Sequence, residues 1–138
     1  MASRIGTLLA VIALSLSAAS CQEKTPSTSG AVINRNVNVA DFAQIIDTAT
    51  TGLLLDVRTA REFASGHIQG AKQIDFYGAD FKERIGELDR EVPVYIYCRS
   101  GNRSGQAASM MKQMGFKEVY NLQGGVGAWA RRNQPLAR

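Results

Sequence analysis

Two patterns of hydrophobic residues alternate along the chain and predict strands interleaved with helices. Apolar residues spaced at i, i+3, i+4 and i+7 share one face of a helix, and this spacing relates Phe42, Ile45, Ile46 and Ala49. Short continuous apolar runs instead predict buried strands. On this second criterion we expect strands at residues 36–39, 53–57, 71–76, 92–97 and 118–122. We expect helices at residues 42–49, 59–64, 77–88, 107–114 and 127–132.

This alternation predicts an α/β fold. Strands that alternate with helices favour a central, mostly parallel sheet of about five strands with helices on both faces. In open sheets of this kind, ligands bind outside the carboxyl ends of the strands. We therefore expect the functional residues directly after the predicted strands.

Length and charge narrow the class of protein. The chain has 138 residues, which suffices for one domain and a tail. Its net charge of +4 is mild and its basic residues are scattered, so we expect no nucleic-acid partner.

The strand at residues 92–97 ends at Cys98, and a short polar loop then leads into a helix. Unpaired N–H groups and the dipole of that helix favour negative charge. Arg99 and Arg103 add positive charge nearby, and each of these effects lowers the pKa of a thiol. We therefore interpret Cys98 as a nucleophile; the alternative is an ordinary buried cysteine.

Three stretches resemble the rhodanese family in the expected order. The loop YCRSGNRS (97–104) resembles the active-site loop, residues 55–71 resemble the N-terminal signature, and residues 121–129 resemble the C-terminal one. The resemblance covers residues 37–132. It implies a rhodanese-like fold and sulfur transfer through a persulfide on Cys98, with no cofactor and no metal.

The resemblance also assigns roles to the residues around the nucleophile. It implies that the substrate anion is bound by the loop residues Arg99, Ser100, Gly101, Asn102 and Arg103. It makes Asp56 and Arg58 structural supports beside the loop, and we expect Ser104 to cap the helix. His67 is the only histidine and could act as a general base, but its Gly-His-Ile setting resembles a position that holds the fold.

The loop length separates two chemistries. Four residues stand between Cys98 and Arg103, whereas tyrosine-phosphatase-like sites have five. We expect the shorter ring to hold a single sulfur atom, taken from an anionic donor such as thiosulfate and passed to cyanide or a thiol. The alternatives are an envelope thiol or persulfide carrier and a non-catalytic binding module. The absence of a Cys-x-x-Cys pair counts against redox chemistry.

The amino-terminal residues resemble an export signal. Arg4, the apolar run 5–16 and the small residues after it predict a signal peptide over residues 1–20. Cys21 follows in a setting that resembles a bacterial lipobox, which implies lipidation of Cys21 and a location on the periplasmic side of a membrane. The alternatives are an uncleaved membrane anchor and a disulfide between Cys21 and Cys98.

The remaining chain then divides into three parts. We expect a flexible tether over residues 21–35, a rhodanese domain over residues 36–132 and a featureless tail over residues 133–138. With Cys21 acylated, Cys98 would be the only free thiol in the mature chain, and we expect it to be exposed.

Overall fold

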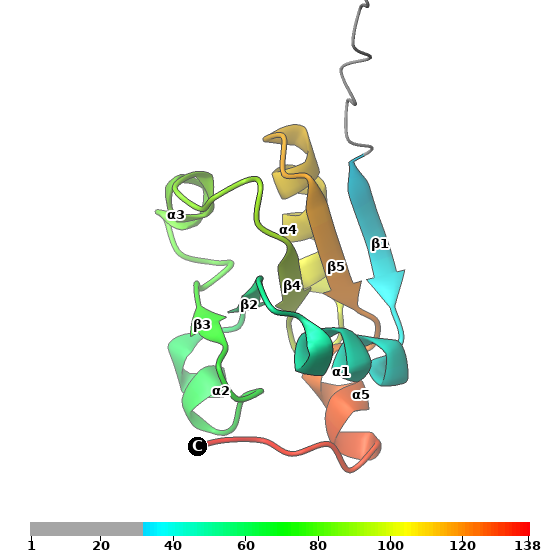
Figure 1. Ribbon diagram of the computed structural model, residues 1–138. Coiled ribbons are helices and arrows are strands. Elements are labelled where there is room, and N and C mark those ends of the chain that lie inside the picture. The colour runs from blue at the N-terminus through cyan, green and yellow to red at the C-terminus, as the bar shows by residue number, and fades with distance from the viewer. Residues whose placement is uncertain (1–31) are drawn as a thin grey trace, which may run out of the picture.

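The computed structural model describes residues 32–138, which form a five-stranded parallel sheet covered by helices (Figure 1). The strands are β1 (Ile33–Val37), β2 (Leu53–Asp56), β3 (Lys72–Gln73), β4 (Val94–Tyr97) and β5 (Glu118–Leu122). The helices are α1 (Val39–Thr48), α2 (Ala60–Ala64), α3 (Phe81–Gly86), α4 (Asn102–Gln113) and α5 (Gly125–Arg131).

The sheet order is β1-β5-β4-β2-β3, and each neighbouring pair is parallel. The predicted α/β class is therefore confirmed. The carboxyl ends of β4 and β5 lie side by side at the centre of the sheet, because Tyr95 pairs with Tyr120 and Ile96 with Asn121. This arrangement brings the loop after β4 next to the loop after β5.

Several element boundaries differ from the prediction. β1 begins at Ile33, within the predicted tether, because it pairs with β5 from Ile33↔Glu118 onward. The sequence INRNV alternates with polar residues and gives no apolar run, so its amino end could not be recognised. β3 is only two residues long, and α3 is six residues long where a helix over residues 77–88 was predicted.

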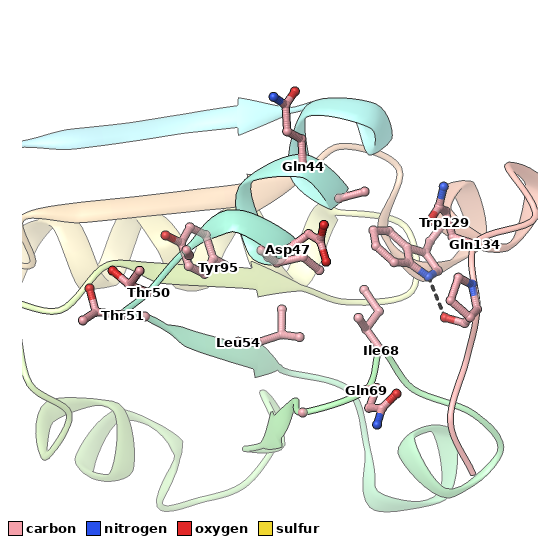
Figure 2. Close-up of a pocket in the computed structure, with 16 residues that line it drawn as sticks. Gln44, Asp47, Thr50, Thr51, Leu54, Ile68, Gln69, Tyr95, Trp129 and Gln134 are labelled. Atoms are coloured by element: carbon pink, nitrogen blue, oxygen red, sulfur yellow. Dashed lines mark hydrogen bonds between the residues drawn. The ribbon is translucent and has the colours of Figure 1, made fainter.

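The carboxyl-terminal tail is also more ordered than predicted. Ala137 forms an antiparallel bridge with His67, with N···O distances of 2.8 and 2.9 Å. The indole Nε1 of Trp129 donates to the carbonyl of Pro135 at 3.0 Å, drawn as the dashed line in Figure 2. These contacts tie residues 133–138 back to the turn before β3, which the sequence did not indicate.

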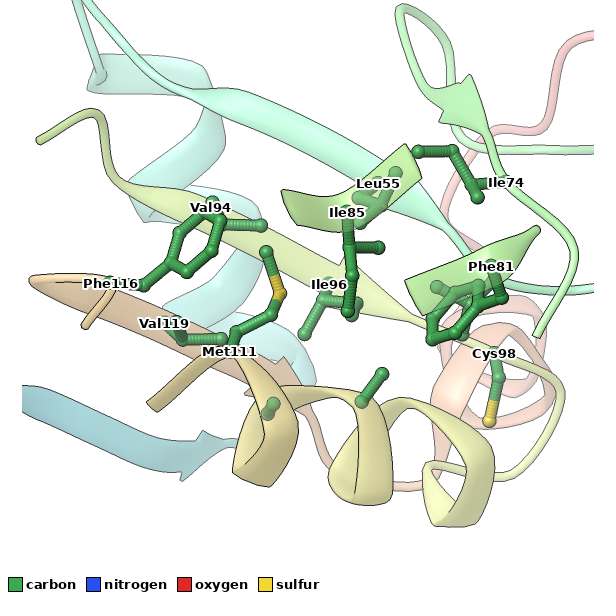
Figure 3. Close-up of a cluster of buried hydrophobic side chains, with 13 residues drawn as sticks. Leu55, Ile74, Phe81, Ile85, Val94, Ile96, Cys98, Met111, Phe116 and Val119 are labelled. Carbon is green, nitrogen blue, oxygen red and sulfur yellow. The ribbon is translucent and has the colours of Figure 1, made fainter. Parts of the chain in front are cut away.

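Two hydrophobic clusters fill the space on either side of the sheet. α3 and α4 contribute to one cluster and α1 and α5 to the other. Along β4 the side chains alternate between the two faces. Val94 and Ile96 belong to the α3/α4 cluster, and Tyr95 and Tyr97 belong to the α1/α5 cluster. Cys98 continues this alternation and lies at the end of the α3/α4 cluster (Figure 3).

The predicted signal peptide, Cys21 and the first part of the tether lie outside the described residues. Within residues 32–138, none of the helices combines the length and the apolar character needed to cross a membrane.

Candidate active site

Cys98 lies where β4 ends and the polypeptide turns into α4. Gly101 occupies the cap position of α4 with a φ of 94°, a left-handed conformation that favours glycine. The short loop therefore curls back so that the first turn of α4 faces the end of β4. This is the position predicted for Cys98, and its thiol is free.

Two hydrogen bonds reach the sulfur of Cys98. The backbone N–H of Gly101 donates to Sγ at 3.1 Å, and the hydroxyl of Ser104 donates to it at 3.3 Å. Burial raises the pKa of Cys98, but hydrogen bonds from Ser104 and from the backbone of Ser100 and Gly101 more than offset it. The pKa of Cys98 is therefore lower than that of an ordinary thiol, which favours the thiolate.

Ser104 does not cap α4, contrary to our expectation. Gly101 takes the cap position, and Ser104 lies inside the helix, fully buried, with its hydroxyl turned toward the sulfur. Because the loop before it is tight, α4 already starts at Asn102, so Ser104 falls within its first turn. Ser104 thus contacts the candidate nucleophile directly.

The expected exposure of Cys98 is wrong, because the residue is 0% exposed. The alternation of β4 directs its side chain into the α3/α4 cluster, and the loop curls over it. Figure 3 shows the sulfur pointing toward α4, away from the labelled apolar side chains of the sheet. A donor can reach Sγ only after the atoms that cover it move aside.

Arg103 is paired rather than free. Its guanidinium donates to both carboxylate oxygens of Glu62, with distances of 2.9 and 2.7 Å. The hydrogen bonds from Arg103 and Thr59 outweigh partial burial and lower the pKa of Glu62 to about 2. The guanidinium also lies over the ring of Tyr77, 5.4 Å from its centroid. Tyr77 itself is 70% exposed beside the loop.

The other predicted anion-binding residues follow the curve of the loop. Gly101 is half-buried, and exposed side chains are found at Arg99, Ser100 and Asn102. Arg99 has no ion pair or side-chain hydrogen bond within residues 32–138. It is therefore the uncompensated cation of the loop.

Asp56 and Arg58, expected as structural supports, form a buried ion pair with each other. The guanidinium of Arg58 donates to the Asp56 carboxylate at 2.6 Å and to the carbonyl of Gly66 at 2.8 Å. It also lies over the ring of Tyr97, the last residue of β4. The pair therefore joins the end of β2 to the turn that contains His67 and supports the strand that carries Cys98.

The glycines after β5 allow a close backbone approach to the loop that follows Cys98. The N–H of Val126 donates to the carbonyl of Cys98 at 2.8 Å, and the N–H of Gly127 donates to that of Arg99 at 3.0 Å. A Cβ on Gly125 would overlap the Cys98 carbonyl. The start of α5 thus fixes the first two residues of the loop.

Sequence reasoning missed two supports of the loop, Asn121 and Glu62. Asn121 lies in β5, and its amide nitrogen donates to the Gly101 carbonyl at 3.2 Å and to Asn36 Oδ1 at 2.8 Å. An asparagine inside an otherwise apolar strand is the only signal that pointed to it. The bond of Glu62 to Arg103 gave no signal, because the two residues are 41 positions apart in the sequence.

His67 lies in a structural setting. Its Nδ1 is 3.2 Å from the Phe63 carbonyl, and its ring stacks on that of Phe63 at 3.8 Å. It makes no hydrogen bond to Cys98, so the geometry does not support a general base. Among the described residues, no three Cys, His, Asp or Glu side chains gather to hold a metal ion.

A groove of the described domain lies elsewhere, on the α1/α5 face (Figure 2). It has a volume of about 830 Å³, and its walls include Leu54, Tyr95 and Trp129. None of the loop residues 98–104 lines it. We therefore place the candidate site at Cys98, where the polar groups converge.

Comparison with known proteins identifies the family. Residues 38–132 match the rhodanese-like domain, and the chain belongs to this family. The structure resembles the crystal structure of a rhodanese-related protein from Thermoplasma volcanium, with a TM-score of 0.66 and 28% identity over 75% of this chain and 97% of that one.

Three curated relatives have sequences similar to this chain. A sulfurtransferase from Allochromatium vinosum is 43% identical over 61% of this chain and 77% of its own length. The thiosulfate sulfurtransferase GlpE of Pseudomonas aeruginosa is 40% identical over 55% of this chain and 67% of its own. The uncharacterized protein YqhL of Bacillus subtilis is 43% identical over 55% of this chain, and the match spans 59% of YqhL.

Proposed function

We propose that this protein is a sulfurtransferase that carries sulfur as a persulfide on Cys98, with thiosulfate as a donor. The hydrogen-bonded, ionisation-prone sulfur of Cys98 carries the proposal. A thiolate is the nucleophilic form of cysteine, and donors aimed at it also stabilise the sulfur anion that forms after transfer. The names of two relatives, a sulfurtransferase and a thiosulfate sulfurtransferase, support the same reaction.

The reaction consists of two displacements. The Cys98 thiolate attacks the outer sulfur of thiosulfate, the S–S bond breaks, and sulfite leaves with the electron pair. Cys98 then carries a persulfide anion. Cyanide or a thiolate attacks the outer sulfur of that persulfide, and the Cys98 thiolate is released with thiocyanate or a new persulfide as product.

The loop residues have defined tasks in this scheme. The N–H of Gly101 and the hydroxyl of Ser104 stabilise negative charge on the sulfur. Arg99 attracts the anionic donor and its sulfite leaving group. The four-residue spacing between Cys98 and Arg103 suits a ring around one sulfur atom and argues against phosphate-ester hydrolysis.

Thiocyanate formation from thiosulfate and cyanide tests this proposal. We expect turnover by the full chain and by Cys21→Ala, and none by Cys98→Ala with its fold intact by circular dichroism. Cys21→Ala is the matched control, because the chain has only these two cysteines. Turnover by Cys98→Ala would contradict the proposal. A folded wild-type protein without turnover would favour a binding module or thiol carrier instead.

We also propose that the chain is exported and anchored by acyl chains on Cys21 at the periplasmic side of a membrane. The support is the order of Arg4, the apolar run 5–16, the small residues 17–20 and Cys21. Intact-mass measurement of the mature protein tests this. An acylated N-terminal Cys21 is expected, and a chain that still begins at Met1 would contradict it.

A further inference from the structure

The cations around the sulfur are not equivalent. The charge of Arg103 is compensated, because Glu62 binds its guanidinium through two hydrogen bonds and their ion pair has an N···O distance of 2.7 Å. The Arg103 side chain is only 14% exposed. An anion that approaches the loop therefore meets a neutral pair there, and uncompensated charge must come from other residues.

Arg131 supplies such a charge next to the start of the loop. It lies in α5, four residues after Gly127, and helical side chains lean toward the amino end of their helix. Its Nη1 is 3.5 Å from the position that a Cβ on Gly127 would occupy. The carbonyl of Arg99 is 3.2 Å from the same point. The Arg131 guanidinium therefore lies beside the backbone of the residue that follows Cys98.

Nothing within residues 32–138 neutralises Arg131. It is exposed, and it makes neither an ion pair nor a side-chain hydrogen bond there. Arg99 is likewise exposed, and its side chain makes neither an ion pair nor a hydrogen bond within these residues. Two unpaired guanidiniums on neighbouring segments, one from the loop and one from α5, create a positive potential beside a covered thiolate.

We propose that Arg131 is a specificity-determining residue that, with Arg99, selects small anionic substrates for Cys98. The inference rests on the proposed sulfur transfer, and it concerns which molecules reach the sulfur rather than how the sulfur reacts. Arg131 gives the site its second uncompensated cation, in place of the Arg103 charge that Glu62 neutralises. Thiosulfate and thiols that carry a carboxylate are substrates of this class.

Alkylation of Cys98 by two reagents of different charge isolates this effect. Iodoacetate and iodoacetamide attack the same thiolate by the same reaction, but only iodoacetate is an anion. We expect Arg131→Gln to lower the ratio of the iodoacetate rate to the iodoacetamide rate by about three- to fivefold at low salt. The ratio should recover with Arg131→Lys, and the effect should vanish at about 0.5 M salt.

Arg132→Gln is the matched control, because it removes the same charge from the adjacent exposed position, which caps the carboxyl end of α5. We expect it to leave the ratio unchanged. Equal effects of Arg131→Gln and Arg132→Gln, or no effect of either, would overturn the role of Arg131. A parallel rise in KM for thiosulfate in Arg131→Gln alone, with kcat retained, would support it.

The two failures can be told apart. If the wild-type protein does not transfer sulfur, the proposed function fails, while the alkylation ratio still reports whether Arg131 selects anions. If Arg131→Gln transfers sulfur with an unchanged KM and an unchanged ratio, the role of Arg131 fails and the proposed function stands.

Discussion

At the scale of single residues, the reactivity of Cys98 depends on two donors that come from different parts of the loop. The Gly101 N–H is a backbone group and is fixed by the turn, whereas the Ser104 hydroxyl is a side chain that can be removed. Because Ser104 is fully buried, its hydroxyl has little alternative partner in water. Ser104 is therefore the residue through which the ionisation of Cys98 can be adjusted without changing the loop.

Ser104→Ala should raise the pKa of Cys98. A hydrogen bond to the anionic sulfur stabilises the thiolate, so its loss should move the pH profile of iodoacetamide alkylation to higher pH. Ser109→Ala is the control, because Ser109 lies on the same helix and its hydroxyl bonds to the Gly105 carbonyl. An unchanged profile in Ser104→Ala would contradict the role that the geometry gives to Ser104.

The residues of the site were predictable to different degrees. Cys98 and its loop could be found because strand, thiol, glycine and arginines are consecutive in the sequence. The contact of Ser104 with the sulfur, the support from Asn121 and the pairing of Glu62 could not, because each depends on how distant segments are packed. The burial of Cys98 follows from the side to which β4 alternates, and the sequence alone left that side open.

At the scale of elements, one carboxylate connects α2 to the first turn of α4, directly after the Cys98 loop. Glu62 completes a capping box with Thr59 at the start of α2 and binds Arg103 in the first turn of α4. The same carboxylate therefore accepts a hydrogen bond from the Thr59 N–H at the start of α2 and holds the first turn of α4 through Arg103. The capping interaction was open to sequence reasoning, whereas the bond to Arg103 required the tertiary structure.

Glu62→Gln should make the free energy of unfolding less dependent on pH in the acidic range. The folded state lowers the pKa of Glu62 from 4.5 to about 2, so its stabilising effect is complete above pH 4.5 and disappears as the pH falls toward 2. Because Glu62 is partly exposed, we expect Glu62→Gln to cost about 1–2 kcal/mol of unfolding free energy at neutral pH. Urea unfolding at several pH values measures this difference, which should shrink between pH 4.5 and 2.

Glu83→Gln provides the comparison for this experiment. Glu83 is an exposed residue of α3 with no ion pair within residues 32–138. Its substitution should have little effect at any pH. A difference between Glu62→Gln and the wild type that stays constant from neutral to acidic pH would show that the carboxylate charge does not hold Arg103.

At the scale of the whole molecule, the carboxyl-terminal segment, residues 133–138, is bound to the domain at two points. Residues 133–138 connect α5 to the turn before β3 through the Trp129–Pro135 hydrogen bond and the Ala137–His67 bridge. α5 in turn donates to the carbonyls of Cys98 and Arg99. The segment therefore supports the helix that holds the first part of the loop, although its sequence carries no recognisable pattern.

Removal of residues 133–138 should destabilise the domain. The deletion leaves the nearly buried indole N–H of Trp129 without its partner and breaks four backbone hydrogen bonds, two of them with His67, which together should cost at least about 2–3 kcal/mol. Thermal unfolding by circular dichroism measures the loss. Deletion of Arg138 alone keeps all five of these bonds and should leave the melting temperature unchanged. Equal melting temperatures for both deletions would contradict this role of the segment.

The overall arrangement was predictable, whereas its edges were not. Alternating apolar runs and helical stripes predicted a parallel sheet between two helical layers, because central strands and the helices packed on them must be apolar. β1 and the tail lie at the margins and are held by backbone hydrogen bonds and single side chains. Such contacts produce no hydrophobic period and become visible only in the folded protein.

The central claim is that the sulfur of Cys98 accepts and carries a single sulfur atom. Mass spectrometry of the folded protein after incubation with thiosulfate, followed by peptide mapping, tests it most directly. The account predicts a gain of one sulfur on the peptide that contains Cys98, reversed by cyanide with release of thiocyanate. An unmodified Cys98 in a folded protein, or sulfur added only at Cys21, would contradict it.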